Sequence, residues 1–113
     1  MDSQLIDRYI DRIFIDEINY EDHPESDHDL ITLYVNLPIE LIDKYKREKG
    51  LEGNPNPEEF WHETGLHGKL REIKIKSQHD TLEDAIELLD GEVMAEFLGH
   101  GKDRIRLRVT EGF

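Results

Sequence analysis

Cysteine is absent from this 113-residue chain, which excludes a disulfide scaffold, a thiolate metal site and a cysteine nucleophile. No run of about 18 apolar residues occurs, so the sequence offers no candidate transmembrane helix. Residues 1–12 also lack the basic start and apolar stretch of a secretory signal. We therefore expect a cytoplasmic protein with no membrane partner.

Residues suited to nucleophilic catalysis are equally scarce. Serine occurs only at positions 3, 26 and 77, and none lies in a glycine-flanked nucleophile elbow. Gly99 and Gly101 are not followed by the Lys-Ser or Lys-Thr pair of a phosphate-binding loop. Carboxylates are too numerous to single out one acid and one base. The sequence thus predicts no catalytic residue and no cofactor, and we expect a non-enzymatic protein.

Lysine and arginine are missing from two long segments, 13–43 and 77–101. Both segments are rich in acids: Asp16, Glu17, Glu21, Asp22, Glu25, Asp27, Asp29, Glu40 and Asp43 in the first, and Asp80, Glu83, Asp84, Glu87, Asp90, Glu92 and Glu96 in the second. The formal net charge is −13, which disfavours direct nucleic-acid binding and favours a basic protein partner. The same acidity would also serve solubility alone, and the sequence leaves both interpretations open.

The clearest structural signal lies in residues 29–50. Aliphatic residues alternate with polar or aromatic ones over positions 30–37, which predicts a strand with one aliphatic face. Pro38 suits the first position of a helix. Apolar residues at helical spacing then follow, and Gly50 is a plausible end of that helix.

Weaker patterns predict the remaining elements. Residues 1–12 favour a short amphipathic helix and residues 12–20 a strand, and residues 21–29 contain no apolar side chain and read as a loop. The long connection 51–68 contains one helical turn that Asn56 would cap, with Pro57 at its first position. Residues 69–78 favour a strand, and residues 81–90 an amphipathic helix that Asp80 or Thr81 would cap.

Residues 91–98 fit either a continuing helix or a strand. A glycine inside a helix costs about 1 kcal/mol relative to alanine, and Gly91 therefore favours a strand paired with residues 104–110. We expect Leu98 to pair with Arg104 and Glu96 with Arg106. The sequence then predicts one α+β domain over residues 1–113, with a single layer of mostly antiparallel sheet (about four to five strands), two helices packed on one side and a short N-terminal helix.

Basic residues gather on two predicted strands. Arg71, Lys74 and Lys76 occupy one, and Arg104, Arg106 and Arg108 the other. If these strands are neighbours, their outer sides form a positive stripe that could hold RNA or another anion. No aromatic residues are interleaved with them to stack bases, and internal neutralisation by nearby acids is the alternative.

Histidines raise a metal hypothesis at two places. His23 and His28 lie among aspartates in one loop, whereas His62, Glu63 and His67 lie in the long connection. The second group is one residue longer than the H-E-x-x-H helix motif, so the two histidines would not share a helix face. We predict no metal, and a metal-dependent hydrolase stays only as a third functional alternative.

Two large aromatics, Phe60 and Trp61, mark the long connection. They suit either a lid over the open side of the sheet or the anchor of a protein interface, where tryptophan is enriched.

Together these features predict a small acidic inhibitor, antitoxin or immunity-type protein, monomeric or homodimeric, that occludes the basic surface of a nucleic-acid-acting partner. A structural or adaptor subunit of a larger assembly, such as one from a phage or mobile element, is the alternative. The predicted contact residues are Glu21, Asp22, Glu25, Asp27, Asp29, Phe60, Trp61, Glu83, Asp84 and Glu87.

Overall fold

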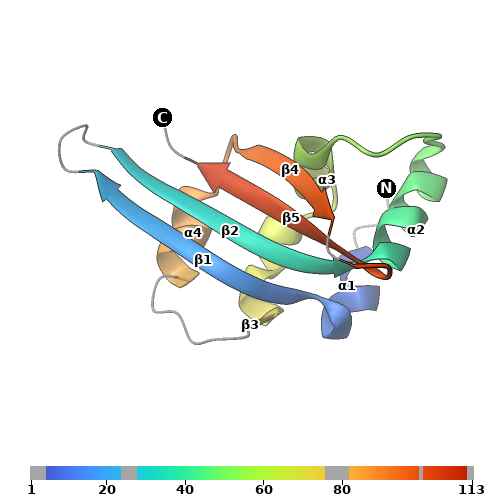
Figure 1. Ribbon diagram of the computed structural model, residues 1–113, viewed down its shortest axis with the longest axis horizontal. Coiled ribbons are helices and arrows are strands. Elements are labelled where there is room, and N and C mark those ends of the chain that lie inside the picture. Colours follow the sequence, from blue (N-terminus) through green and yellow to red (C-terminus); the bar gives the residue numbers. More distant parts are fainter. Residues whose placement is uncertain (1–4, 24–27, 76–81, 100, 112–113) are drawn as a thin grey trace.

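The computed structural model describes residues 5–23, 28–75, 82–99 and 101–111. Their strands form one five-stranded sheet in the order β3-β1-β2-β5-β4 (Figure 1). The strands are β1 (Phe14–His23), β2 (His28–Pro38), β3 (Lys74–Ile75), β4 (Met94–Gly99) and β5 (Arg104–Glu111). Neighbouring strands are antiparallel except β1 and β3, which are parallel. The predicted α+β class with a mostly antiparallel sheet is confirmed.

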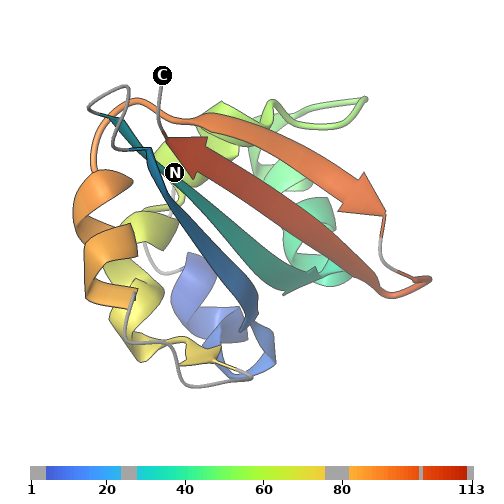
Figure 2. The same cartoon turned by 60° about the vertical axis from the view of Figure 1, so that its left-hand side comes forward.

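The helices lie on one face of the sheet, and within the described part of the chain no helix covers the opposite, open face (Figure 2). The helical segments are α1 (Leu5–Tyr9), α2 (Ile39–Lys49), α3 (Pro57–Glu63) and α4 (Leu82–Leu88), with the 3-10 segments η1 (Ile10–Arg12) and η2 (Leu66–Glu72). Antiparallel sheets commonly cover one face in this way and leave the other to solvent and polar side chains.

Strand β2 supplies the centre of the core. Its aliphatic residues Ile31, Leu33, Val35 and Leu37 are all fully buried, as their alternation predicts. Both flanking strands pair with β2 over most of its length. From the helices, Leu41 and Tyr45 of α2 and Leu5 and Ile6 of α1 pack against the same layer.

A row of three aromatic side chains, Tyr45, Phe60 and Phe97, connects α2 and α3 to β4. The rings of Tyr45 and Phe60 meet edge-to-face with centroids 5.1 Å apart, and Phe60 meets Phe97 in the same way at 5.6 Å. Such pairs contribute about 0.5–1.5 kcal/mol beyond their area burial. The row therefore fixes α3 over the edge of the sheet.

The helix ends follow the predicted signals with one small correction. Asn56 caps α3, because its side-chain oxygen accepts hydrogen bonds from the backbone N–H groups of Glu58 at 2.9 Å and Glu59 at 3.0 Å. Gly50 ends α2 in the left-handed region at φ 68°. Pro38, however, is the N-cap of α2 rather than its first helical residue, since its ψ of 141° is extended.

The β4–β5 hairpin is confirmed, but its predicted register is wrong by two residues. Leu98 pairs with Arg106 rather than Arg104, and Glu96 pairs with Arg108 rather than Arg106. Side chains alternate with a period of two, so a two-residue shift keeps the same residues on the core face. Apolar patterning alone therefore cannot distinguish the two registers.

The predicted strand 69–78 is largely wrong. Residues 66–72 form η2, only Lys74 and Ile75 are paired as β3, and residues 76–78 lie outside the described residues. Leu66, Leu70 and Ile73 are buried. Their i, i+4, i+7 spacing is typical of a helix and not of the predicted strand.

The predicted loop 21–29 is also shorter than expected. Strand β1 continues to His23 and β2 begins at His28, with Asp22 paired to Asp29. Residues 24–27 lie outside the described residues. Hydrogen bonds between the backbones of two strands do not require apolar side chains. The hairpin therefore extends beyond the residues at which apolar side chains alternate.

Replacing Asn56 with alanine tests the α3 cap. We expect Asn56→Ala to lower the free energy of unfolding by about 1 kcal/mol, because two backbone donors lose their acceptor. Urea denaturation of the variant measures the change. Asn54→Ala is the matched control, since Asn54 is exposed in the same connection and precedes the cap; equal losses from both variants would contradict the capping role.

Candidate functional site

The acids of α4 lie on the solvent side of that helix. Ala85 and Ile86 are buried, whereas Glu83, Asp84 and Glu87 are exposed. This separation is the expected result of an amphipathic helix whose apolar stripe faces the sheet. Among the described residues, Asp84 and Glu87 form no ion pair.

The distal end of the β1–β2 hairpin lies at the same end of the molecule as α4 (Figures 1 and 2). The pairs Glu21 with Leu30 and Asp22 with Asp29 place three of the predicted acidic residues on the last rungs of this hairpin. Helix α4 also contacts β2 directly. We call this region, Glu21, Asp22, Asp29, Glu83, Asp84 and Glu87, the acidic end. Predicted residues Glu25 and Asp27 lie outside the described residues.

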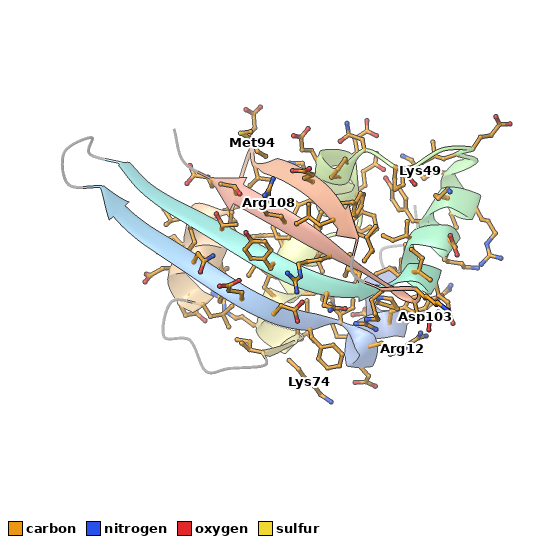
Figure 3. The ribbon with its side chains drawn as sticks, viewed as in Figure 1. Arg12, Lys49, Lys74, Met94, Asp103 and Arg108 are labelled. Atoms are coloured by element: carbon orange, nitrogen blue, oxygen red, sulfur yellow. The ribbon has the colours of Figure 1, made fainter. Side chains whose placement is uncertain are left out.

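The opposite end of the molecule carries much of the basic charge. The molecule measures 45 × 26 × 26 Å, and α2 with Lys44, Lys46, Arg47 and Lys49 lies at the other end of its long axis (Figure 1). Arg12 and Lys49 are seen at this α2 end in Figure 3. Acidic residues are present there too, and Arg12 pairs with Glu40 at 3.0 Å. Charge is therefore mixed at the α2 end and of one sign over much of the acidic end.

One cation does reach α4. Arg71 of η2 donates two hydrogen bonds to Glu83, from Nε to Oε1 at 3.1 Å and from Nη2 to Oε2 at 2.8 Å. This fork lowers the pKa of the Glu83 carboxyl below its ordinary 4.5 and raises the pKa of Arg71. Both side chains are about two-thirds exposed, at 65% and 67%, so water screens the pair and its contribution to stability is small.

Phe60 and Trp61 do not belong to an exposed interface, which corrects that part of the predicted contact set. Their exposed fractions are 0% and 1%. Phe60 packs in the aromatic row, and the Trp61 ring meets the His67 ring edge-to-face at 6.0 Å. They form a lid, but on the helix-covered face of the sheet and not over its open side as predicted.

The predicted positive stripe is not continuous. Strand β3 lies at one edge of the sheet and β5 is separated from it by β1 and β2, so Arg71 and Lys74 are not neighbours of the β5 arginines. Arg108 of β5 lies on the open face (Figure 3) and pairs with Glu96 of β4. The arginines of β5 therefore interact with side chains of the same sheet. This pairing argues against an anion-binding site at β5.

A buried polar network on the open face was not found from the sequence. Asp16 accepts a hydrogen bond from Asn36 at 3.1 Å and another from Arg106 Nε at 3.2 Å, and Arg104 Nε donates to Asn36 Oδ1 at 2.6 Å. The Asp16 side chain is 7% exposed and Asn36 4%. Burial, together with the nearby charge of Arg12, lowers the pKa of Arg104. The network joins β1, β2 and β5 and is structural.

The histidines of the long connection lie near one another without forming a metal site. His62 and His67 both line a surface pocket of about 270 Å³ beside Asp90, and His67 Nε2 is 2.6 Å from the carbonyl oxygen of Ile86. No group of three or more His, Asp or Glu side chains in the described ranges could hold a metal ion. His23 and His28 are paired across the hairpin end by their backbones.

Comparison of this chain with protein-family models, with curated proteins and with solved structures gives no match. Of the helices in the described ranges, none is both long and apolar enough to span a membrane. The assignment of function therefore depends on the geometry and charge of the molecule.

The Arg71–Glu83 pair gives a pH prediction. A carboxyl whose pKa is lower in the folded state adds stability above its ordinary pKa of 4.5, and this stability is lost as the pH falls through the lower folded-state value. We expect NMR titration to give Glu83 a pKa below 4.5, and Arg71→Gln to move it upward. Lys74→Gln, an equal charge change on β3, is the control and should leave the Glu83 pKa low; the same upward movement in both variants would contradict the pairing.

Proposed function

We propose that this protein is a non-enzymatic inhibitor, antitoxin or immunity-type protein whose acidic end occludes the basic surface of a protein that acts on nucleic acids. The observation that carries the proposal is that parts of two acidic segments, the end of the β1–β2 hairpin from the first and α4 from the second, lie at one end of the fold. Neither segment contains lysine or arginine.

Uncompensated negative charge on a surface favours binding of a basic partner. Carboxylates crowded on one surface repel one another, and a partner that brings cations to them gains free energy on binding. Proteins that bind nucleic acids carry such cations in rows that match phosphates. A row of carboxylates can meet the same surface, and the protein would then compete with the nucleic acid for it.

Pairing within the chain leaves two acids of the acidic end available to a partner, although Glu83 is paired with Arg71. The exposed acids away from the acidic end include several with a cation of their own: Asp7 with Lys69 at 2.9 Å, Glu63 with Lys49 at 2.5 Å and Glu40 with Arg12. At the acidic end, Asp84 and Glu87 have no such cation among the described residues. The remaining negative charge is therefore available to an external partner.

An adaptor subunit of a larger assembly is the second candidate. It is supported by the exposed methionine Met94, 60% exposed on the edge strand β4. Exposed apolar residues at a sheet edge favour contact with another chain. Light scattering separates the two candidates, because the adaptor predicts a stable homo-oligomer and the inhibitor needs none.

Neutralising the acidic end tests the proposed function. Partners are captured from a native lysate at low and high salt, and a captured protein is purified and titrated with the wild type and with Asp84→Asn/Glu87→Gln. Exposed ion pairs contribute about 0.2–1 kcal/mol each, so we expect the double variant to bind roughly 2- to 30-fold more weakly at low salt. A nucleic-acid fragment should compete with the wild type for the partner.

The matched control is Asp43→Asn/Glu48→Gln, which removes the same charge from exposed positions of α2 at the other end of the molecule. It should bind nearly as the wild type does. Equal weakening by both double variants, or affinity that does not change with salt, would contradict docking at the acidic end.

A further inference from the structure

Within the described part of the chain, strand β1 is paired along its outer edge over only a short stretch. It is paired with β2 from Phe14 to His23, but β3 pairs only with Phe14 and Ile15 on its other side. Among the described residues, no strand lies beside positions 17–23 on that side. With respect to the described residues, alternate backbone N–H and C=O groups of this segment are without a strand partner on that side, as on an edge strand.

This open segment is regular enough to act as a template. The β-bulge of β1 falls between Ile15 and Glu17, and the register then runs without interruption from Glu17 opposite Tyr34 to His23 opposite His28. Seven residues of strand extend about 23 Å at the usual rise per residue. That length matches an ordinary strand, so one added segment could pair along all of it.

The charge around this edge selects the kind of segment. Neither β1 nor β2 contains lysine or arginine, and Glu17 and Asn19 are exposed on the open segment. The other edge strand, β4, carries Glu96 and lies beside β5, whose arginines already interact with side chains of the sheet. The lack of lysine and arginine in β1 and β2 therefore favours a basic segment at the β1 edge.

We propose that the β1 edge, positions 17–23, receives an extended lysine- or arginine-rich segment of the partner protein, which adds a strand to the sheet. The inference rests on the proposed function and specifies its mode of binding: main-chain hydrogen bonds give the alignment, and the acids beside the edge give the preference for basic side chains. The added strand would end at the acidic end, where the same partner surface meets α4.

A second copy of this chain fits the edge poorly. Two β1 edges placed side by side would bring Glu17, Glu21 and Asp22 of both copies into the same ladder. Like charges opposite each other destabilise strand pairing. The partner segment is therefore basic and comes from a different protein.

Two synthetic peptides test the proposal on the full-length protein. One alternates lysine and valine, and the other has the same sequence with alternate backbone amides N-methylated, which keeps the charge and removes the ladder donors along one edge. We expect the unmodified peptide to bind at least about tenfold more tightly at low salt, because several hydrogen bonds are lost on methylation. It should also slow amide hydrogen exchange at positions 17–23.

A pair of variants makes the test specific to the edge. Glu17→Lys should weaken binding of the unmodified peptide more than Glu48→Lys, which makes the same charge change on α2. Equal binding of the two peptides, no binding of either, or protection at β4 in place of β1 would overturn the proposal.

These results also separate the edge from the proposed function. If both peptides bind equally and Asp84→Asn/Glu87→Gln weakens both, docking at the acidic end stands and strand addition does not. If the unmodified peptide binds at β1 but Asp84→Asn/Glu87→Gln does not weaken binding of the natural partner, the result supports strand addition. It then contradicts occlusion by the acidic end.

Discussion

Strand β2 buries its aliphatic face under the helices and satisfies its backbone by pairing with β1 and β5, and most of this structure follows from these two requirements. Ile31, Leu33, Val35 and Leu37 face the helices and are fully buried. Burying side chains of this kind contributes about 1.5–3 kcal/mol each before the entropic cost of ordering the chain. The pairing also fixes where the polar ends of β1 and β2 must lie.

The same burial determines where the acids lie. The β1–β2 ladder continues past the apolar residues, so it carries Glu21, Asp22 and Asp29 to one end of the molecule. Helix α4 buries Ala85 and Ile86, which turns its own acids outward at that end. A surface that serves only solubility is best made of interspersed charges of both signs, and the α2 end is built in that way. At the acidic end the structure describes one cation, Arg71, which pairs with Glu83 and leaves Asp84 and Glu87 without an ion pair among the described residues.

Local signals predicted the central elements well. The alternation in β2, the Asn56 cap and the end of α2 at Gly50 each depend on residues close together in sequence. The hairpin β4–β5 was also predictable, but its register was not, because a shift of two residues leaves every core position unchanged. The acidic end needed the fold, since it joins β1 and β2 to α4.

Two features could not be predicted for physical reasons. The Asp16–Asn36–Arg106 network depends on the bulge in β1, which changes the register by one residue and re-aims Asp16. Phe60 and Trp61 are as suitable for a core as for an interface, and only their packing in the structure decides between the two.

The central claim is that Asp84 and Glu87, which form no ion pair among the described residues, are not neutralised within the chain. Their mutual repulsion should then lower stability when salt does not screen it. The most direct measurement is the free energy of unfolding of the wild type, of Asp84→Asn/Glu87→Gln and of Asp43→Asn/Glu48→Gln at about 10 mM and about 150 mM NaCl. The account predicts that salt stabilises the wild type and that the Asp84/Glu87 variant loses more of this stabilisation than the Asp43/Glu48 variant. Stability that does not rise with salt, or an equal loss in both variants, would contradict it.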